Sequence, residues 1–263
     1  MDFTELKDLD FYNRSRHPWE KARMKIIIRM LKSTLKKADK TNPVVVDIGC
    51  GDVYLSGHIA SSFPGCEIHA VDPAFTEKII QKIRKLTGDA GLTLYDKIDN
   101  IALPSGKKAD IVLLLDVIEH IEDDAGFLSA LINNKHVSKE TTFIITTPAF
   151  QWLFSSHDKF LKHYRRYSRR SLTSTLNKSR LRPLKSGYFF FVLLFPRIIR
   201  LYLEKLKLVK TADKGIGQWK HGSLVTWFIV AFLRIDGFLG SIFLSMGITL
   251  PGLSVYSICK PTP

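Results

Sequence analysis

The stretch of sequence that decides the fold is PVVVDIGCGD, residues 43–52. Its first half is an apolar, β-branched run interrupted only by Asp47, which is typical of a strand buried on both faces of a parallel sheet. Gly49 and Gly51 follow, and residues 54–62 can then form a helix. This order of strand, glycine-rich turn and helix brings a cofactor against bare backbone amides and the positive end of a helix. It predicts an α/β protein with a cofactor site at the turn.

A second strand-like stretch, EIHAVD, ends at Asp72, 25 residues beyond Asp47. A carboxylate at this place can accept hydrogen bonds from both hydroxyls of a ribose. The ordered set of strand, glycines, helix and acidic residue is more specific than two glycines alone. It indicates a cofactor that contains a ribose, and it leaves open a nucleotide-binding domain of another kind or a turn that binds nothing.

DIGCGD, residues 47–52, resembles the first motif of class I S-adenosylmethionine (SAM)-dependent methyltransferases, an acidic residue followed by Gly-x-Gly-x-Gly. Val53 replaces the third glycine, and valine resists a positive φ. The resemblance implies that the turn passes close to the methionine part of SAM and that Asp72 holds the ribose. The turn residues that it assigns to the cofactor are Asp47, Gly49, Cys50 and Gly51.

The composition limits the size and the partners of the protein. A chain of 263 residues can form one α/β domain with an insertion and is short for two domains. Lys and Arg number 39 against 25 Asp and Glu, and the net charge of +14 implies an anionic partner, either nucleic acid or a membrane surface. Three cysteines without metal-ligand spacing fit a reducing compartment. The first fifteen residues are polar, so no secretory signal is expected.

RHPW, residues 16–19, opens a predicted helix that begins at Pro18 and runs to about Lys37, because proline suits the first helical turn. The bare pattern is that of an amphipathic helix at the edge of a sheet. The string also resembles a segment upstream of the SAM motif in a subgroup of these methyltransferases, the one that combines types 11 and 23. There it covers the cofactor, which places Arg16 or His17 near the SAM carboxylate.

Two further predicted strands each end in an acidic residue. LTLY, residues 92–95, is followed by Asp96, which by resemblance would meet the adenine amino group, with Asp99 as a competitor. DIVLLLD, residues 110–116, is the clearest central strand of the chain. Asp116 stands at its carboxyl end, where α/β sheets place their ligands, and is a further candidate for the cofactor.

LDVIEHIEDD, residues 115–124, closely resembles the fourth-strand motif of the same methyltransferases. Within it, Glu119 and His120 have the residue types of a catalytic pair or of metal ligands. No second His or Cys stands in register with them along the chain. We therefore interpret them as a hydrogen-bonded structural turn and predict no metal site.

HDKFLKHYRRYS, residues 157–168, follows a predicted fifth strand at 142–147. The bare pattern is a solvated basic loop before a helix, but the motif resembles one in methyltransferases whose substrates tend to be lipids or lipid-linked sugars. Its position predicts that it stands over the carboxyl edge of the sheet. Arginine forks suit phosphate or carboxylate, and His or Tyr can deprotonate a hydroxyl or an amine. The candidate catalytic residues are His157, His163 and Tyr164. The candidate acceptor-binding residues are Arg165, Arg166 and Tyr167.

Residues 184–191 and 253–259 predict the last two strands, which in the family form an antiparallel edge hairpin. The unusually apolar insertion between them, at about 192–250, carries Arg234 and Asp236, which are costly at the centre of a bilayer. We therefore expect helices that lie in the membrane interface. A buried helical subdomain, a dimer interface or a single spanning helix are the alternatives. The expected basic and aromatic border consists of Lys205, Lys207, Lys210, Lys214, Lys220, Trp219 and Trp227.

The sequence thus predicts a single methyltransferase domain over residues 1–263, with a Rossmann-like, seven-stranded, mostly parallel sheet, an antiparallel edge hairpin and a hydrophobic helical insertion. The expected reaction transfers a methyl group from SAM to an amphiphilic, lipid or lipid-linked acceptor and leaves S-adenosylhomocysteine (SAH). We expect a cytoplasmic protein, peripheral on the inner face of an anionic membrane. The alternatives are a nucleic-acid or soluble small-molecule methyltransferase and a non-catalytic SAM-binding partner protein. The chain shows no recognisable RNA-binding module, which argues against nucleic acid, and it does not indicate an oligomeric state.

Overall fold

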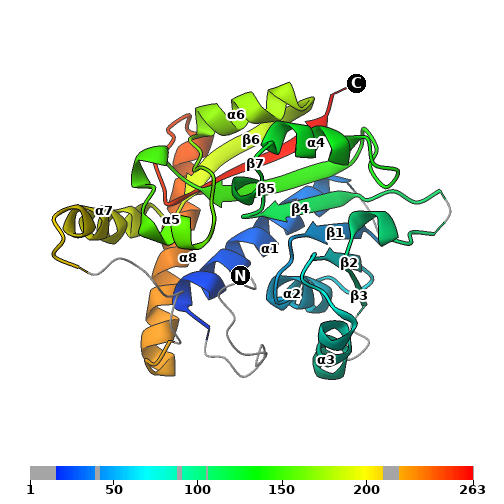
Figure 1. The fold of residues 1–263 in the computed structure, drawn as a ribbon, viewed down its shortest axis with the longest axis horizontal. Helices are drawn as coiled ribbons and strands as arrows, with labels where there is room; N and C mark the ends of the chain where they lie inside the picture. The colour runs from blue at the N-terminus through cyan, green and yellow to red at the C-terminus, as the bar shows by residue number, and fades with distance from the viewer. Residues whose placement is uncertain (1–15, 39–41, 88–90, 105, 210–218, 263) are drawn as a thin grey trace.

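The centre of the molecule is a seven-stranded sheet of order β3-β2-β1-β4-β5-β7-β6 (Figure 1). The computed structural model describes residues 16–38, 42–87, 91–104, 106–209 and 219–262. The strands are β1 (Val44–Ile48), β2 (Glu67–Val71), β3 (Leu92–Tyr95), β4 (Ile111–Leu115), β5 (Thr142–Pro148), β6 (Leu181–Phe189) and β7 (Ser254–Pro261). The first five are parallel, and β7 runs antiparallel between β5 and β6. This is the Rossmann-like sheet that the sequence predicts.

Helices cover both faces of the sheet, and α5, α7 and α8 gather at one end of it (Figure 1). The helices are α1 (Pro18–Ala38), α2 (Tyr54–Ser62), α3 (Glu77–Thr87), α4 (Asp124–Ile132), α5 (Ser156–Phe160), α6 (Arg169–Lys178), α7 (Phe191–Lys205) and α8 (Ser223–Ser245). Short 3₁₀ turns are η2 (Ile98–Asn100), η3 (Ile118–His120) and η4 (Gln151–Leu153). The chain moves from β1 outward to β3 and then returns to β4, so the topological switch point lies between β1 and β4. Ligands of open α/β sheets bind at that point.

The central strands are buried on both faces because their side chains alternate between two hydrophobic clusters. Val45, Leu113 and Ile144 pack with residues of α1 and α2 on one face. Val46 and Val112 pack with residues of α4 and α6 on the other. The continuous apolar runs of β1 and β4 therefore reflect two dry faces, as the sequence pattern indicates.

The sixth strand begins and ends earlier than the sequence predicts. It contains Pro183, and its register with β7 shifts between Pro183 and Lys185. Proline is tolerated there because β6 is an edge strand. Phe190 has a φ of 67°, which ends the strand and starts α7. The predicted last residue of the strand, Phe191, is therefore the first residue of a helix.

The segment between β6 and β7 forms two helices that pack on the domain. At Gly237 of α8 an added Cβ would lie 2.9 Å from Ile26 Cδ1 of α1, so the glycine permits the close approach of these helices. Asp236, in the middle of the apolar helix, accepts a hydrogen bond from the Val192 amide at 3.4 Å. Its carboxylate thus lies at the amino end of α7, where a negative charge is favourable. Asp236 of α8 therefore makes a contact within the protein.

Asp236 predicts a measurable cap on α7. Asp236→Ala should lower the free energy of unfolding by about 1 kcal/mol, the usual cost of removing an acceptor at a helix amino end. Arg234→Ala is the control, since Arg234 is an exposed residue of the same helix and such changes usually stay within about 0.5 kcal/mol. Urea unfolding in mild detergent, followed by circular dichroism, measures both. Equal losses for the two variants would contradict the cap.

Candidate functional site

The turn after β1 has the backbone shape of a cofactor-binding loop. Gly49 and Gly51 have φ values of 68° and 57°, which glycine adopts without strain. The Gly49 amide donates to Val71 O at 2.8 Å. A Cβ at Gly49 would lie 2.6 Å from Val117 Cγ2. The position therefore excludes side chains on both conformational and steric grounds.

Val53 adopts the left-handed conformation expected of the third glycine of the motif, with a φ of 52°. A β-branched residue there is strained by about 1–3 kcal/mol. Its side chain is only 1 % exposed and packs with Ala70, Phe75 and Ile83, which offsets that cost. The departure from the family motif therefore leaves the shape of the turn unchanged.

Two carboxylates hold the turn and the helix after it in place through hydrogen bonds. Asp72 accepts hydrogen bonds from the amides of Gly51 and Ala74, each at 2.9 Å. Asp47 accepts from the Ser56 hydroxyl at 2.5 Å, and burial raises the pKa of Asp47 to about 6. Asp72 thus lies at the glycine turn, where the sequence predicts the ribose contact, whereas Asp47 is enclosed and links β1 to α2.

The other turn residue assigned to the cofactor, Cys50, is buried, and burial raises the pKa of its thiol well above the ordinary value. Because its side chain is buried, Cys50 presents only its backbone atoms to a ligand at the turn. All three cysteines are buried and free.

Asp96 is half-buried after β3 and accepts a hydrogen bond from Asn100 Nδ2 at 2.6 Å, whereas Asp99 is exposed. Asp96 therefore has the better position for an adenine contact.

The start of the N-terminal helix reaches the glycine turn. Arg16 forms an ion pair with Asp52 at 2.5 Å, and its guanidinium lies 4.2 Å from the centre of the Tyr54 ring. Seven residues further on, about two helical turns, Arg23 pairs with Asp116 at 2.7 Å, and Asp116 itself has a φ of 60°. The helix thus bridges the ends of β1 and β4 on either side of the switch point.

The two long motifs that follow β4 and β5 are fastened to each other. The Tyr164 amide donates to Glu119 O at 2.8 Å. Arg165 pairs with Asp124 at 3.0 Å and donates to Glu122 O at 2.6 Å. These contacts hold the segment after β5 over the carboxyl edge of the sheet.

The three predicted acceptor-binding residues differ in access. Tyr167 is 2 % exposed and donates to Asp124 Oδ2 at 2.5 Å, so it fastens the two motifs from within the core. Arg166 is also buried, with its Nε 2.7 Å from Asp158. Only Arg165 keeps partial access, with 31 % of its side chain exposed. The local sequence contains Asp158 but does not indicate its contact with Arg166, and the partner of Arg165, Asp124, lies outside the motif.

Asp158 is the centre of a buried ion cluster. It is fully buried and contacts His163 Nδ1 at 3.0 Å, Arg166 Nε at 2.7 Å and Arg197 Nη2 at 3.2 Å. Burial alone would raise its pKa, but the hydrogen bond from His163 and the charge of Arg166 hold the pKa of Asp158 well below its usual range. Arg197 comes from α7, so the cluster ties the apolar insertion to the motif that follows β5.

His163 also meets the motif that follows β4. Its ring lies 4.6 Å from that of His120, edge to face. Glu119 is fully buried, and neither of its carboxylate oxygens has a hydrogen-bond partner among the described residues. Burial, together with the charge of Asp116, raises the pKa of Glu119. The fold therefore supplies the second histidine that the linear sequence does not place in register with Glu119 and His120.

The other two candidate catalytic residues lie differently. His157 is half-buried on α5, where burial and the charge of Arg197 lower its pKa to about 4. It is therefore neutral at physiological pH and can accept a proton only weakly. Tyr164 is 51 % exposed at the surface of the same segment. Of the three, His163 is the one that the fold holds against other ionisable groups of the site.

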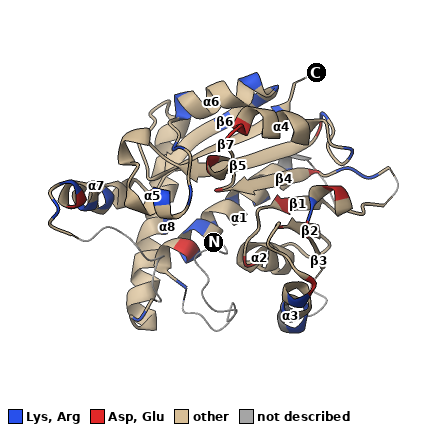
Figure 2. Ribbon diagram, viewed as in Figure 1, with Lys and Arg blue, Asp and Glu red and all other residues tan. Residues whose placement is uncertain are grey.

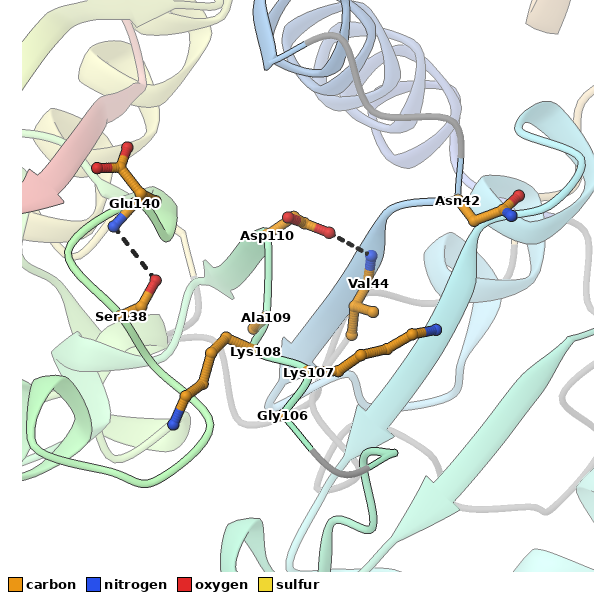
Figure 3. Close-up of a pocket in the computed structure, with 9 residues that line it drawn as sticks. All are labelled: Asn42, Val44, Gly106, Lys107, Lys108, Ala109, Asp110, Ser138 and Glu140. Atoms are coloured by element: carbon orange, nitrogen blue, oxygen red, sulfur yellow. Dashed lines mark hydrogen bonds between the residues drawn. The ribbon is translucent and has the colours of Figure 1, made fainter.

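A surface cavity of 520 Å³ lies at the opposite edge of the sheet (Figure 3). It is lined by Asn42, Val44, Gly106, Lys107, Lys108, Ala109, Asp110, Ser138 and Glu140. These residues stand at the amino ends of β1, β4 and β5, away from the glycine turn. Lys107 pairs with Glu67 at 3.2 Å, and Lys108 donates to Lys135 O at 2.5 Å. The cavity is therefore separate from the candidate site.

Sequence reasoning missed Arg23, Asp52 and Arg197. A usable signal existed for Arg23. Glu20 follows Arg16 by four residues and Arg23 follows Glu20 by three, a spacing that places side chains on one face of a helix. No local signal identifies Asp52 or Arg197 as partners, since each contacts a residue that is distant along the chain.

The Asp158 cluster predicts a pH-dependent loss of stability. Asp158→Asn should lower the free energy of unfolding at pH 7 by about 3 kcal/mol, because it leaves buried cations without their counter-charge. The folded-state pKa of Asp158 is depressed, so its contribution is present above the ordinary carboxyl pKa of 3.8 and is lost as the pH falls below that value. Lys159→Ala, on the exposed neighbour, is the control. Equal unfolding free energies of wild type and Asp158→Asn at pH 7 would refute this account.

Comparisons with known proteins agree with this geometry. A family model described as "Methyltransferase domain" matches residues 19–184, more than half of the chain. The ubiquinone biosynthesis O-methyltransferase of Methylocella silvestris is 34 % identical over 86 residues, which are 32 % of each chain. The match thus spans about a third of that curated relative.

Solved structures share the fold at low identity. Coclaurine N-methyltransferase, with N-methylheliamine and SAH, has a TM-score of 0.51 at 14 % identity, over 89 % of this chain and 72 % of that one. Haemonchus contortus phosphoethanolamine N-methyltransferase 2, with phosphomonomethylethanolamine and SAH, has 0.51 at 16 %, over 89 % and 53 %. Burkholderia thailandensis 1,6-didemethyltoxoflavin-N1-methyltransferase has 0.51 at 12 %, over 91 % and 78 %. The left-handed glycine turn and the carboxylate of Asp72 fit the SAM site that the sequence predicts. The chain belongs to the family of methyltransferase domains.

Proposed function

We propose that this enzyme methylates an amphiphilic acceptor at an anionic membrane surface, to which it attaches as a peripheral protein of the inner face. The observation that carries the proposal is a broad apolar surface on α7 and α8. We call it the α7–α8 apolar surface, and its residues, each more than half exposed, are Phe195, Ile199, Tyr202, Leu224, Trp227, Phe228, Phe232 and Ile235. A group of large exposed apolar side chains on neighbouring helices is a feature of interaction sites.

The arrangement of α8 favours helices that lie in the interface. Among the described residues α8 is the one helix long and apolar enough to cross a membrane, and only 6 % of its most apolar window is buried. Figure 2 shows few charged residues along it. Asp236 contacts α7, and Gly237 packs on α1. A helix held sideways against the domain presents one face to lipid, as an interfacial helix does.

Lysines stand beside this surface. Lys205, Lys207 and Lys220 are exposed, whereas the predicted Lys210 and Lys214 lie outside the described residues. Each lysine near an anionic surface contributes about 1 kcal/mol of attraction. Trp227 is exposed, but Trp219 packs against His17 and donates to Thr226, so its contacts are within the protein.

The apolar surface adjoins the acceptor side of the site. Arg197 of α7 contacts Asp158, and Asp158 in turn holds His163. An amphiphile whose tail stays in the membrane can therefore bring its head group toward the carboxyl edge of the sheet. We propose that the exposed part of Arg165 faces an anionic head group there.

SAM supplies a methyl group on a sulfonium, and the bond to the acceptor forms as the carbon–sulfur bond breaks and SAH leaves. The protein mainly has to hold the acceptor in line at near-attack distance. The name of the aligned relative, an O-methyltransferase, supports oxygen as the acceptor atom. A hydroxyl acceptor must lose its proton, and His163 is placed to assist.

Asp72→Ala should weaken SAM binding by about 10- to 150-fold, since a hydrogen-bonded charged acceptor for the ribose contributes roughly 1.5–3 kcal/mol. Calorimetry with SAM and SAH measures this. Glu77→Ala, at an exposed acidic position that follows β2, should bind as the wild type does. Unchanged affinity in a folded Asp72→Ala protein would remove Asp72 from the cofactor site.

Membrane attachment predicts co-sedimentation with vesicles of phosphatidylcholine and phosphatidylserine, and less with phosphatidylcholine alone. Trp227→Glu with Ile235→Glu should lower vesicle affinity at least about 10-fold, because each substitution removes roughly 1.5–3 kcal/mol of apolar burial. Leu184→Glu is the control, at an exposed apolar position on β6. Methyl-labelled SAM should label an organic-phase product of the vesicle-bound enzyme.

Three outcomes would oppose the proposal. One is a protein that remains in solution beside anionic vesicles. The second is equal loss of binding in Leu184→Glu and the double variant. The third is salt-sensitive binding and labelling of RNA, which would favour a nucleic-acid substrate instead.

A further inference from the structure

We propose that Glu119, His120 and His163 bind a divalent transition-metal ion, for which Zn²⁺ is the probe, beside the methyl donor. Each residue offers one ligand atom, and the three atoms lie within 4.8 Å of one another. The binding of the ion rests on geometry alone. Its role in the reaction rests on the proposed methylation of an oxygen.

The three side chains are held together by backbone contacts that do not depend on a metal. The Tyr164 amide donates to Glu119 O at 2.8 Å, which anchors the residue after His163 to the turn that carries the other two ligands. Zn²⁺ lies about 2.0–2.2 Å from imidazole nitrogen and carboxylate oxygen, so its ligands stand roughly 3–3.5 Å apart. The three ligand atoms, which lie within 4.8 Å of one another, would therefore have to approach by at most about 1–2 Å.

Glu119 is the group that most requires a cation. Both carboxylate oxygens are buried, and neither has a hydrogen-bond partner among the described residues. A buried carboxylate without partners is costly. The nearby arginines are engaged elsewhere, Arg23 with Asp116 and Arg166 with Asp158. A divalent ion would satisfy Glu119 where those guanidinium groups do not.

His163 is oriented as a metal ligand is. Its Nδ1 lies 3.0 Å from Asp158 Oδ1, and because the carboxylate can only accept, Nδ1 carries the proton. The lone pair is then on Nε2. A carboxylate that fixes the tautomer and the ring orientation in this way is the usual support of a metal-bound histidine. Arg166 and Arg197 keep Asp158 ionised for that purpose.

Three protein ligands leave a coordination position for the acceptor. Catalytic zinc sites have this composition and lower the pKa of a bound hydroxyl. Glu119 follows Asp116, at the end of β4, by three residues, so an oxygen on the ion stands near the switch point. An ion held by these residues would make the hydroxyl more acidic, so that its proton would pass to solvent; the oxygen would then take the methyl group as the carbon–sulfur bond of SAM breaks. The site thus assigns the acceptor to hydroxyl compounds.

The test is calorimetric titration of metal-free, full-length protein with Zn²⁺, and with Co²⁺ as a spectroscopic probe. We expect one ion per chain. Glu119→Gln and His163→Ala should each weaken binding at least about 10-fold, and Asp158→Asn about 10- to 100-fold through the loss of ligand orientation. His58→Asn is the control, at a partly exposed histidine on α2 that should leave metal affinity unchanged. Glu119→Gln keeps the side-chain shape and removes a buried charge, so it should fold.

The proposal is overturned if no ion binds, or if affinity is the same in Glu119→Gln, His163→Ala and wild type. Metal binding is read without turnover, so it is independent of membrane attachment. An enzyme that labels a vesicle lipid at full rate after chelation would retain the proposed function and lose the metal. A protein that binds one Zn²⁺ through these residues but labels no lipid would retain the metal site and lose the membrane substrate.

Discussion

The buried charge of Asp158 is the constraint on which the proposed acceptor side of the molecule depends. Three cationic or hydrogen-bonding groups converge on it, from His163, Arg166 and Arg197. His163 and Arg166 belong to the motif after β5 and Arg197 belongs to α7, two segments that β6 separates along the chain. Burying the charged carboxylate of Asp158 without such partners would be costly, so the three groups and Asp158 hold their segments in place together.

This constraint makes the apolar insertion part of the site. Arg197 stands in the first half of α7, and its contact with Asp158 passes through the same carboxylate that orients His163. An insertion that only anchored the protein to a surface would not need a buried ion pair with the acceptor motif. The proposed attachment through α7 and α8 would therefore be coupled to the position of His163 by one side chain, whereas the glycine turn, held by Asp72 and by backbone, is independent of it.

The sequence was sufficient for the sheet and for the glycine turn, because β-branched runs and glycine spacing are local signals. Val53 shows the limit of that reasoning, since its left-handed φ is supported by burial that the motif does not display. The acceptor side could be predicted only in outline. The two arginines of HYRRY resemble free ligands for an anion when only the local sequence is considered, but each forms an ion pair, Arg165 with Asp124 and Arg166 with Asp158. Glu119 and His163 are 44 positions apart, and only the parallel order of β4 and β5 brings them together.

Buried ion clusters contribute little net stability compared with apolar side chains of the same volume, so their value lies in the geometry that they impose. Methyl transfer requires an acceptor atom in line with the sulfonium, and small displacements are costly. A hydrophobic core around His163 would allow its ring several rotamers, whereas a carboxylate on Nδ1 permits one orientation. The same argument applies to Asp236, the one acidic residue of α8, because its carboxylate accepts a hydrogen bond from the first turn of α7 and so fixes the two helices relative to each other. Because Arg197 and Asp236 turn inward, much of the outer face of both helices remains apolar, and a single arrangement supplies an ordered site and the surface on which the proposed membrane contact rests.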